Sequence, residues 1–316
     1  MNTPARLGLY ATGLAAAFGA AFLVADAVVP ADAVDDWNAS IAAQDGHGDA
    51  EADDAPLANG VSLDREGYRL ADVAAPGEPG RAGELSFTVV DASGAAVTEY
   101  AESHEKDLHL VVVRGDGAEF RHVHPEIGAD GTWSLPWTWE AAGGYRVFAD
   151  FVPAAQDESI TLTSTLQVAG DFVPQEIAGE VREASVDGYD VTLEGELRVG
   201  ASSDLTLAVA KDGEPVTELE PYLGAFGHLV ALRSGDLSYL HVHPEGADPE
   251  AGELSGPEIA FVSEAPTPGR YLLYFDFQID GVVRSVPFQV DAGDPADDGT
   301  GTDGEAEHGT GEGHER

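Results

Sequence analysis

The feature that most constrains this chain is an internal repeat. Three segments of the first half recur 119 residues later, and the pairs are Val97-Thr-Glu with Val216-Thr-Glu, His109-Leu-Val-Val-Val-Arg with His228-Leu-Val-Ala-Leu-Arg, and Phe120-Arg-His-Val-His-Pro-Glu with Tyr239-Leu-His-Val-His-Pro-Glu. A fourth pair, beginning at Gly144 and Arg270, is offset by 126 residues, so the second copy carries seven extra residues in the loop around 246–257. The pattern predicts a tandem duplication, with each copy about 110–120 residues long.

The copies have the signature of β-structure. Residues 84–90 and 159–168 alternate between apolar and polar side chains with period two, and turn residues interrupt the runs at close intervals. After residue 25 no stretch keeps a 3.6-residue apolar period, so the pattern favours an all-β fold. We expect two tandem immunoglobulin-like β-sandwiches, one over residues 61–172 and one over 183–290.

The N-terminal segment predicts export. Residues 7–25 follow Arg6 and contain no charge, and 19 residues of helix can cross a bilayer core of about 30 Å. Residues 1–25 are therefore a transmembrane anchor or a signal sequence, and the small triplets at 25–27 and 31–33 are candidate cleavage sites. By the positive-inside rule Arg6 keeps the N-terminus in the cytoplasm. We expect a single-pass cell-membrane protein with extracytoplasmic C-terminal domains, the alternative being a secreted protein.

Charge and composition exclude several functions. The net charge is −43, which argues against binding nucleic acid or anionic lipid through a basic surface. We interpret residues 26–60 as an acidic linker and residues 291–316 as a disordered acidic tail. We expect the histidines of these segments, His47, His308 and His314, to be solvated. The chain has no cysteine and one methionine, Met1. A transition metal would have to be held by imidazole and oxygen.

Each copy keeps three histidines, which makes them the candidate metal ligands. They are His109, His122 and His124 in the first copy and His228, His241 and His243 in the second. In a strand, residues two apart project from one face. If the first hairpin turns between residues 116 and 117, opposed residues have numbers that sum to 233, and His109 faces His124. The second hairpin, turning between 235 and 236, would pair His228 with His243 in the same way.

Three imidazoles placed this way on two adjacent strands can hold zinc or copper and leave one position open. Glu126 and Glu245 follow the histidines and are possible additional ligands, as is His104, which only the first copy has. Asp150 and Asp276 could orient a histidine or satisfy a loop backbone. We therefore expect a copper or zinc ion in each copy.

These residues also resemble a known family. The pattern Ser103-His-Glu-Lys, Leu108-His-Leu, Phe120-Arg-His-Val-His-Pro and Gly144-Tyr followed by Asp150-Phe resembles exported bacterial proteins with a heavy-metal-binding, YtkA-like β-sandwich. The resemblance covers residues 61–290 and implies extracytoplasmic metal binding, with copper as the expected metal and no redox catalysis. The second copy lacks the His-Glu-Lys feature.

Three function classes remain from the sequence. The leading one is a membrane-tethered binder of Cu(II) or Zn(II) that acts as a buffer, carrier or resistance factor, with the metal ion and the membrane as its partners. The alternative is a structural or adhesion module in which the histidines pack as a polar cluster without metal. A metal-dependent enzyme is disfavoured, because no general base, nucleophile motif or phosphate-binding loop is recognisable. The sequence identifies no protein partner.

Overall fold

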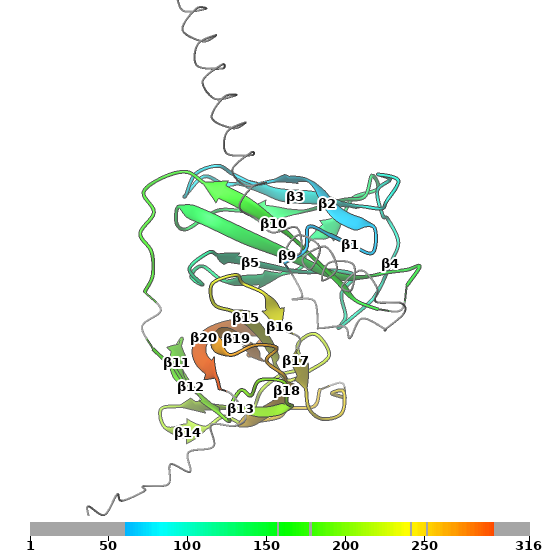
Figure 1. Ribbon diagram of the computed structural model, residues 1–316. Coiled ribbons are helices and arrows are strands. Elements are labelled where there is room, and N and C mark those ends of the chain that lie inside the picture. The colour runs from blue at the N-terminus through cyan, green and yellow to red at the C-terminus, as the bar shows by residue number, and fades with distance from the viewer. Residues whose placement is uncertain (1–60, 157, 177–178, 241, 251, 294–316) are drawn as a thin grey trace, which may run out of the picture. The chain divides into compact units, whose positions relative to one another are not determined.

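The computed structural model describes residues 61–156, 158–176, 179–240, 242–250 and 252–293. In these ranges all regular structure is β-strand, from β1 to β20 (Figure 1). The described ranges contain no helix that is long and apolar enough to span a membrane. The predicted anchor and acidic linker lie outside the described residues, as does the predicted tail from residue 294 onward.

The first copy folds into two antiparallel sheets. Their strand orders are β1-β2-β3-β8-β7 and β10-β9-β5-β6, with β4 paired to β9. The strands are Asp64–Arg65 (β1), Tyr68–Ala74 (β2), Gly83–Val90 (β3), Tyr100–Ala101 (β4), His109–Arg114 (β5), Arg121–Val123 (β6), Glu126–Ile127 (β7), Thr132–Trp137 (β8), Gly143–Pro153 (β9) and Ile160–Val168 (β10).

The second copy repeats this arrangement with two further sheets. Their strand orders are β11-β12-β13-β18-β17, with β14 paired to β13, and β16-β15-β19-β20. The strands are Glu183–Val186 (β11), Tyr189–Glu194 (β12), Ser203–Lys211 (β13), Glu214–Pro215 (β14), His228–Arg233 (β15), Tyr239–Leu240 (β16), Val242–Pro244 (β17), Glu258–Ser263 (β18), Gly269–Ile279 (β19) and Val282–Ala292 (β20). The last strand extends two residues into the predicted tail.

Each pair of sheets encloses its own apolar core, as alternating strands require. In the first copy, buried residues from both sheets meet, among them Leu85, Phe87, Trp133, Val147 and Leu162. In the second copy the equivalent core includes Leu205, Leu207, Phe261, Leu273 and Phe288. The prediction of an all-β fold with sandwich-like paired sheets is confirmed. The immunoglobulin-like type of each sandwich stays a prediction.

The central strands β5 and β15 are buried on both faces, which explains their continuous apolar sequence. Leu110 and Val112 of β5 enter the first core, whereas Val111 and Val113 point the other way. There they join a third apolar cluster, to which both copies contribute. We call it the inter-repeat cluster, and its buried members are Val111, Val113, Phe148, Val230, Leu232, Leu237, Leu272 and Tyr274.

Aromatic and hydrogen-bonded contacts reinforce the inter-repeat cluster. Phe120 of the first copy stacks on Tyr274 of the second, with ring centroids 3.9 Å apart and planes at 3°. The Tyr274 hydroxyl donates a hydrogen bond of 2.6 Å to the carbonyl of Gly117. Gly117 has a φ of 82°, and a Cβ there would lie 2.5 Å from Leu272 Cδ1, so this turn requires glycine. The strand alternation places His109 and His228 on the same faces as this cluster.

Candidate functional site

His109 is a buried candidate ligand at the start of a central strand. It begins β5, opposite Asp150 of β9, and is 8% exposed. Its Nε2–H donates a hydrogen bond of 2.9 Å to the carbonyl of Ser103. Ser103 belongs to a tight turn closed by two backbone hydrogen bonds with Lys106, in which His104 and Glu105 have positive φ. Because Nε2 carries the proton, the Nδ1 atom of neutral His109 presents a lone pair.

His122 is oriented by a residue of the second copy. It lies in β6, opposite Val111 of β5. Its Nδ1–H donates a hydrogen bond of 2.9 Å to Oδ2 of Asp276, a buried residue whose carboxylate also accepts a hydrogen bond from Ser285. A carboxylate that fixes the tautomer of an imidazole is the usual arrangement around metal-binding histidines. In the neutral ring, Nε2 therefore presents its lone pair.

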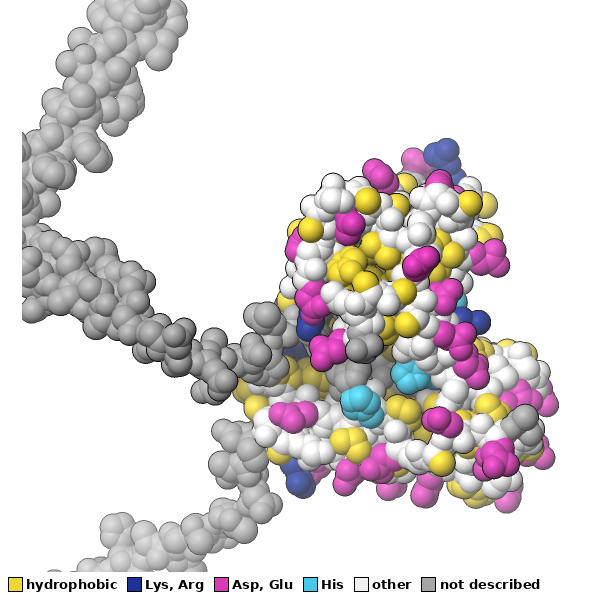
Figure 2. Space-filling view, turned by 90° about the vertical axis from the view of Figure 1, so that its right-hand side faces the viewer, with side chains coloured by type: hydrophobic (Ala, Val, Ile, Leu, Met, Phe, Trp, Pro, Cys, Tyr) yellow, Lys and Arg dark blue, Asp and Glu magenta, His cyan; other side chains and the backbone are white. Residues whose placement is uncertain are grey.

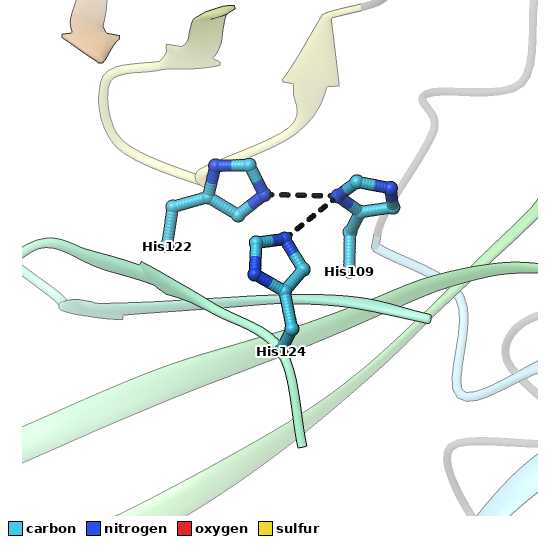
Figure 3. Close-up of side chains that lie close together, drawn as sticks. All are labelled: His109, His122 and His124. Atoms are coloured by element: carbon cyan, nitrogen blue, oxygen red, sulfur yellow. Dashed lines mark hydrogen bonds between the residues drawn. The ribbon is translucent and has the colours of Figure 1, made fainter. Parts of the chain in front are cut away.

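The nitrogens of three histidines converge on one point, as Figure 3 shows. Nε2 of His122 lies 3.1 Å from Nδ1 of His109, and Nε2 of His124 lies 3.2 Å from the same atom. Nδ1 of His109 has one lone pair, so it cannot accept two good hydrogen bonds. Hydrogen bonding alone therefore leaves the group unsatisfied, whereas a cation at the centre would use every lone pair. We call His109, His122 and His124 the histidine triad.

The dimensions of the triad fit a tetrahedral ion. With metal–nitrogen bonds of about 2.0–2.1 Å, two ligand nitrogens lie about 3.3 Å apart and two imidazole centroids about 5.2 Å apart. The two nitrogen separations above are close to this value. The ring centroids are 5.4 Å apart for His109 and His122, 4.9 Å for His109 and His124, and 5.0 Å for His122 and His124. All three ligand nitrogens lie within 4.8 Å of one another.

Burial keeps two of the triad histidines, His109 and His124, in the form that binds metal. Burial lowers the pKa of His109 to about 4, against the raising effect of its hydrogen bond to Ser103. Burial, with the neighbouring charges of His122 and His109, lowers the pKa of His124 to about 2. Neutral imidazole is the ligand form of histidine, so at neutral pH both residues are available to a metal ion.

Comparison with known proteins adds a family to this geometry. The profile described as "Domain of unknown function (DUF8832)" matches residues 63–170 and, a second time, residues 184–294. The chain belongs to the DUF8832 family. Its two DUF8832 segments coincide with the two copies of the repeat. No curated protein matches the chain.

Several solved structures are distantly similar to the DUF8832 chain. Invasin, a bacterial integrin-binding protein, is 14% identical with a TM-score of 0.21, and the match covers 72% of this chain and 39% of invasin. Salmonella alpha-2-macroglobulin reacted with methylamine is 16% identical, with a TM-score of 0.26 and coverage of 72% and 15%. The D0-D1 domain of intimin is 12% identical, with a TM-score of 0.21 and coverage of 71% and 96%. Likenesses with TM-scores this low say nothing further about the chain.

The hairpin register of the first DUF8832 segment is as predicted. Leu110 pairs with Val123 and Val111 with His122, so the numbers of opposed residues sum to 233. The period-two alternation then places His109, His122 and His124 on one face, and the structure brings their nitrogens together. All three predicted ligands of this segment belong to the triad.

In the second DUF8832 segment the predicted pairing of His228 with His243 is wrong. The hairpin begins in the expected register, with Leu232 opposite Tyr239. After Leu240, however, the chain joins the other sheet, where His243 of β17 pairs with Val262 of β18 and is exposed. In the first segment the crossing occurs later, at β7, after both histidines. His241 lies outside the described residues, and within the described ranges the triad is the one group of three or more histidine and carboxylate side chains that lie close enough together to hold an ion.

The possible additional ligands lie outside the triad. Glu126 is in β7, on the other sheet of its sandwich, and is exposed. Glu245 is also exposed, and its backbone N–H donates to Ala260. His104 is exposed, but its ring lies near the triad, with its centroid 6.0 Å from that of His109. His47, His308 and His314 are not among the described residues.

Two neighbours of the triad come from the second DUF8832 segment. Asp276 is hydrogen-bonded to His122, and the ring centroid of His228 lies 6.2 Å from that of His122. The sequence allowed Asp276 to orient a histidine, but it offered no sign that the histidine would belong to the other copy. Figure 2 shows histidine side chains reaching the surface among acidic side chains.

Proposed function

We propose that this DUF8832 chain binds a divalent transition-metal ion, copper or zinc, through the histidine triad. The supporting observation is the protonation pattern. The Nε2–H of His109 and the Nδ1–H of His122 are both directed away from the triad, to Ser103 and Asp276. The remaining nitrogens face each other at 3.1 Å with no proton between them in the neutral rings. A cation resolves this arrangement of converging acceptors.

Two considerations bear on the metal. The spacing of the triad nitrogens is close to that of a tetrahedral ion, which suits zinc. In a square-planar Cu(II) site, neighbouring nitrogens would be closer, at about 2.8 Å. Affinity instead favours copper, because Cu(II) binds nitrogen ligands more tightly than zinc does. The chain has no cysteine and a single methionine, which disfavours a thiolate or thioether site for Cu(I).

The biological role that we propose is that of an extracytoplasmic buffer, carrier or resistance factor for this ion. Three protein ligands leave one coordination position for water or for a ligand of a partner, which suits binding and release. The proposed location rests on the sequence of residues 7–25, which would tether the two segments to the cell membrane. The resemblance to YtkA-like heavy-metal-binding proteins agrees with this role. Protease accessibility of the two segments in intact cells tests the location.

X-ray absorption spectroscopy of the zinc-loaded and copper-loaded chain tests the proposal. We expect imidazole nitrogen scattering from three ligands at about 2.0–2.1 Å. We also expect the midpoint of thermal unfolding to rise with zinc concentration, because an ion that binds only the folded state stabilises it. If the chain is instead a metal-free structural or adhesion module, neither ion will raise the midpoint and no ordered imidazole ligation will be detected.

A further inference from the structure

A second pair of imidazoles lies beside the triad, one from each DUF8832 segment. His104 comes from the turn before β5, and His228 begins β15. Their ring centroids are 5.6 Å apart and their planes make an angle of 84°. The relation resembles that of His109 and His124, whose planes make an angle of 85°. The two rings therefore meet edge to face, at a centroid separation close to the 4.9–5.4 Å found within the triad.

His228 is prepared for metal binding in the same way as His109. Its Nε2–H donates to the carbonyls of Tyr222 and Leu223, at 3.0 and 3.1 Å, in the turn that corresponds to Ser103–Lys106. Nδ1 of the neutral ring is thus left with a lone pair. Burial, with the neighbouring charges of His122 and His104, lowers the pKa of His228 to about 3. His228 is half-buried and His104 is exposed, so the pair extends from the interior to solvent.

His104 and His228 lie farther from the neighbouring triad histidines than the triad histidines lie from one another. Two imidazoles on one tetrahedral ion have centroids about 5.2 Å apart. The separations of His104 from His109, 6.0 Å, and of His228 from His122, 6.2 Å, exceed this value, whereas the separation within the pair is closer to it. Asp276, which is opposite His228 in β19 and carries a buried carboxylate, offsets the positive charge of a second ion.

We propose that His104 and His228 bind a second divalent cation at the junction of the two DUF8832 segments. With two protein ligands, one of them exposed, this site is weaker than the triad, and water completes its coordination. The second ion is therefore the one that exchanges with solvent. The site joins the two copies of the repeat, in contrast to an arrangement with one equivalent site per copy.

The test is a calorimetric titration of the full chain with Zn(II), repeated with Co(II) so that absorption reports the coordination geometry. All proteins carry His47→Ala, His308→Ala and His314→Ala, which removes weak binding by the terminal segments. We expect the parent to bind two ions with different affinities. His104→Ala should lose the weaker ion and keep the tighter one unchanged. Lys106→Gln, in the same turn, is the matched control and should keep both.

The reciprocal variants complete the test. His124→Ala should lose the tighter ion and keep the weaker, and His228→Gln should behave like His104→Ala. The proposal is overturned if the parent binds a single ion, or if the weaker ion survives both His104→Ala and His228→Gln. It is also overturned if His104→Ala weakens the tighter ion, because His104 would then be a ligand of the triad. If the triad itself binds no metal, His124→Ala changes nothing, and the two failures are thus distinguished.

Discussion

Nδ1 of His122 donates a hydrogen bond of 2.9 Å to Oδ2 of Asp276, a residue 154 positions further along the chain and in the other copy of the repeat. The side chains of both residues are buried, at 5% and 2% exposed. A ligand candidate of the first segment is therefore oriented by the second segment. The duplication contributes more than a second sandwich, because the candidate metal centre depends on contacts between the copies.

We predict that Asp276→Asn lowers the zinc affinity of the triad about 10–100-fold, the usual cost of losing a carboxylate that orients a ligating histidine. The substitution keeps the size of the side chain but removes the charge that holds His122 in its tautomer. Calorimetric titration measures the effect. Asp150→Asn is the matched control at the corresponding position of the first segment, where the carboxylate accepts hydrogen bonds from Ser159 and Thr161. Equal affinities for the two variants would contradict the role given to Asp276.

We predict that Tyr274, in the inter-repeat cluster, stabilises the fold through two separable contacts, which are its buried stacked ring and its hydrogen bond. Tyr274→Phe keeps the stacking on Phe120 but loses the hydrogen bond to Gly117, so we expect a loss of about 1 kcal/mol in the free energy of unfolding. Tyr274→Ala removes the buried ring as well, and we expect a loss of about 3–5 kcal/mol. Urea unfolding monitored by tryptophan fluorescence gives both values. A Tyr274→Ala variant as stable as wild type would show that the ring is not buried between the copies.

The lowered pKa of the Asp116 carboxyl group makes the stability of the fold depend on pH. Burial raises the pKa of Asp116, but the hydrogen bonds from Arg114 and from the backbone N–H groups of Gln175 and Ala118 oppose this and leave the pKa below its ordinary value. An aspartate in the unfolded chain has a pKa of about 3.9. Since the folded pKa is lower, the ionised carboxylate contributes stability above about pH 4, and this contribution is lost as the pH falls through the folded pKa.

The substitution Asp116→Asn removes this pH-dependent contribution to stability. Asp116→Asn should lower the free energy of unfolding by about 2 kcal/mol at neutral pH, the scale of a hydrogen bond to a charged group. The difference from wild type should shrink as the pH falls below about 4. Urea unfolding over a pH series measures it, with Asp212→Asn, an exposed turn residue, as control. A difference that stays constant across the series would mean that the charge of Asp116 is not involved.

The first hairpin shows how much of the site was predictable. The face shared by His109 and His122 follows from period-two alternation and from the position of the turn, both of which are local properties of the sequence. The exchange of sheets after Leu240 was not predictable, because residues 239–244 have the same apolar alternation whichever sheet they join. The contact of His122 with Asp276 could not be predicted either, since it depends on how the two sandwiches pack against each other.

The most direct test of the central claim compares His124→Ala with His243→Ala by zinc titration. The two residues are equivalent in the repeat, 119 positions apart, but His124 belongs to the triad and His243 is exposed on β17. We predict that His124→Ala abolishes the tightest zinc site and that His243→Ala leaves it unchanged. Equal effects of the two substitutions, or a tight site that survives His124→Ala, would contradict the assignment of the metal site to the triad.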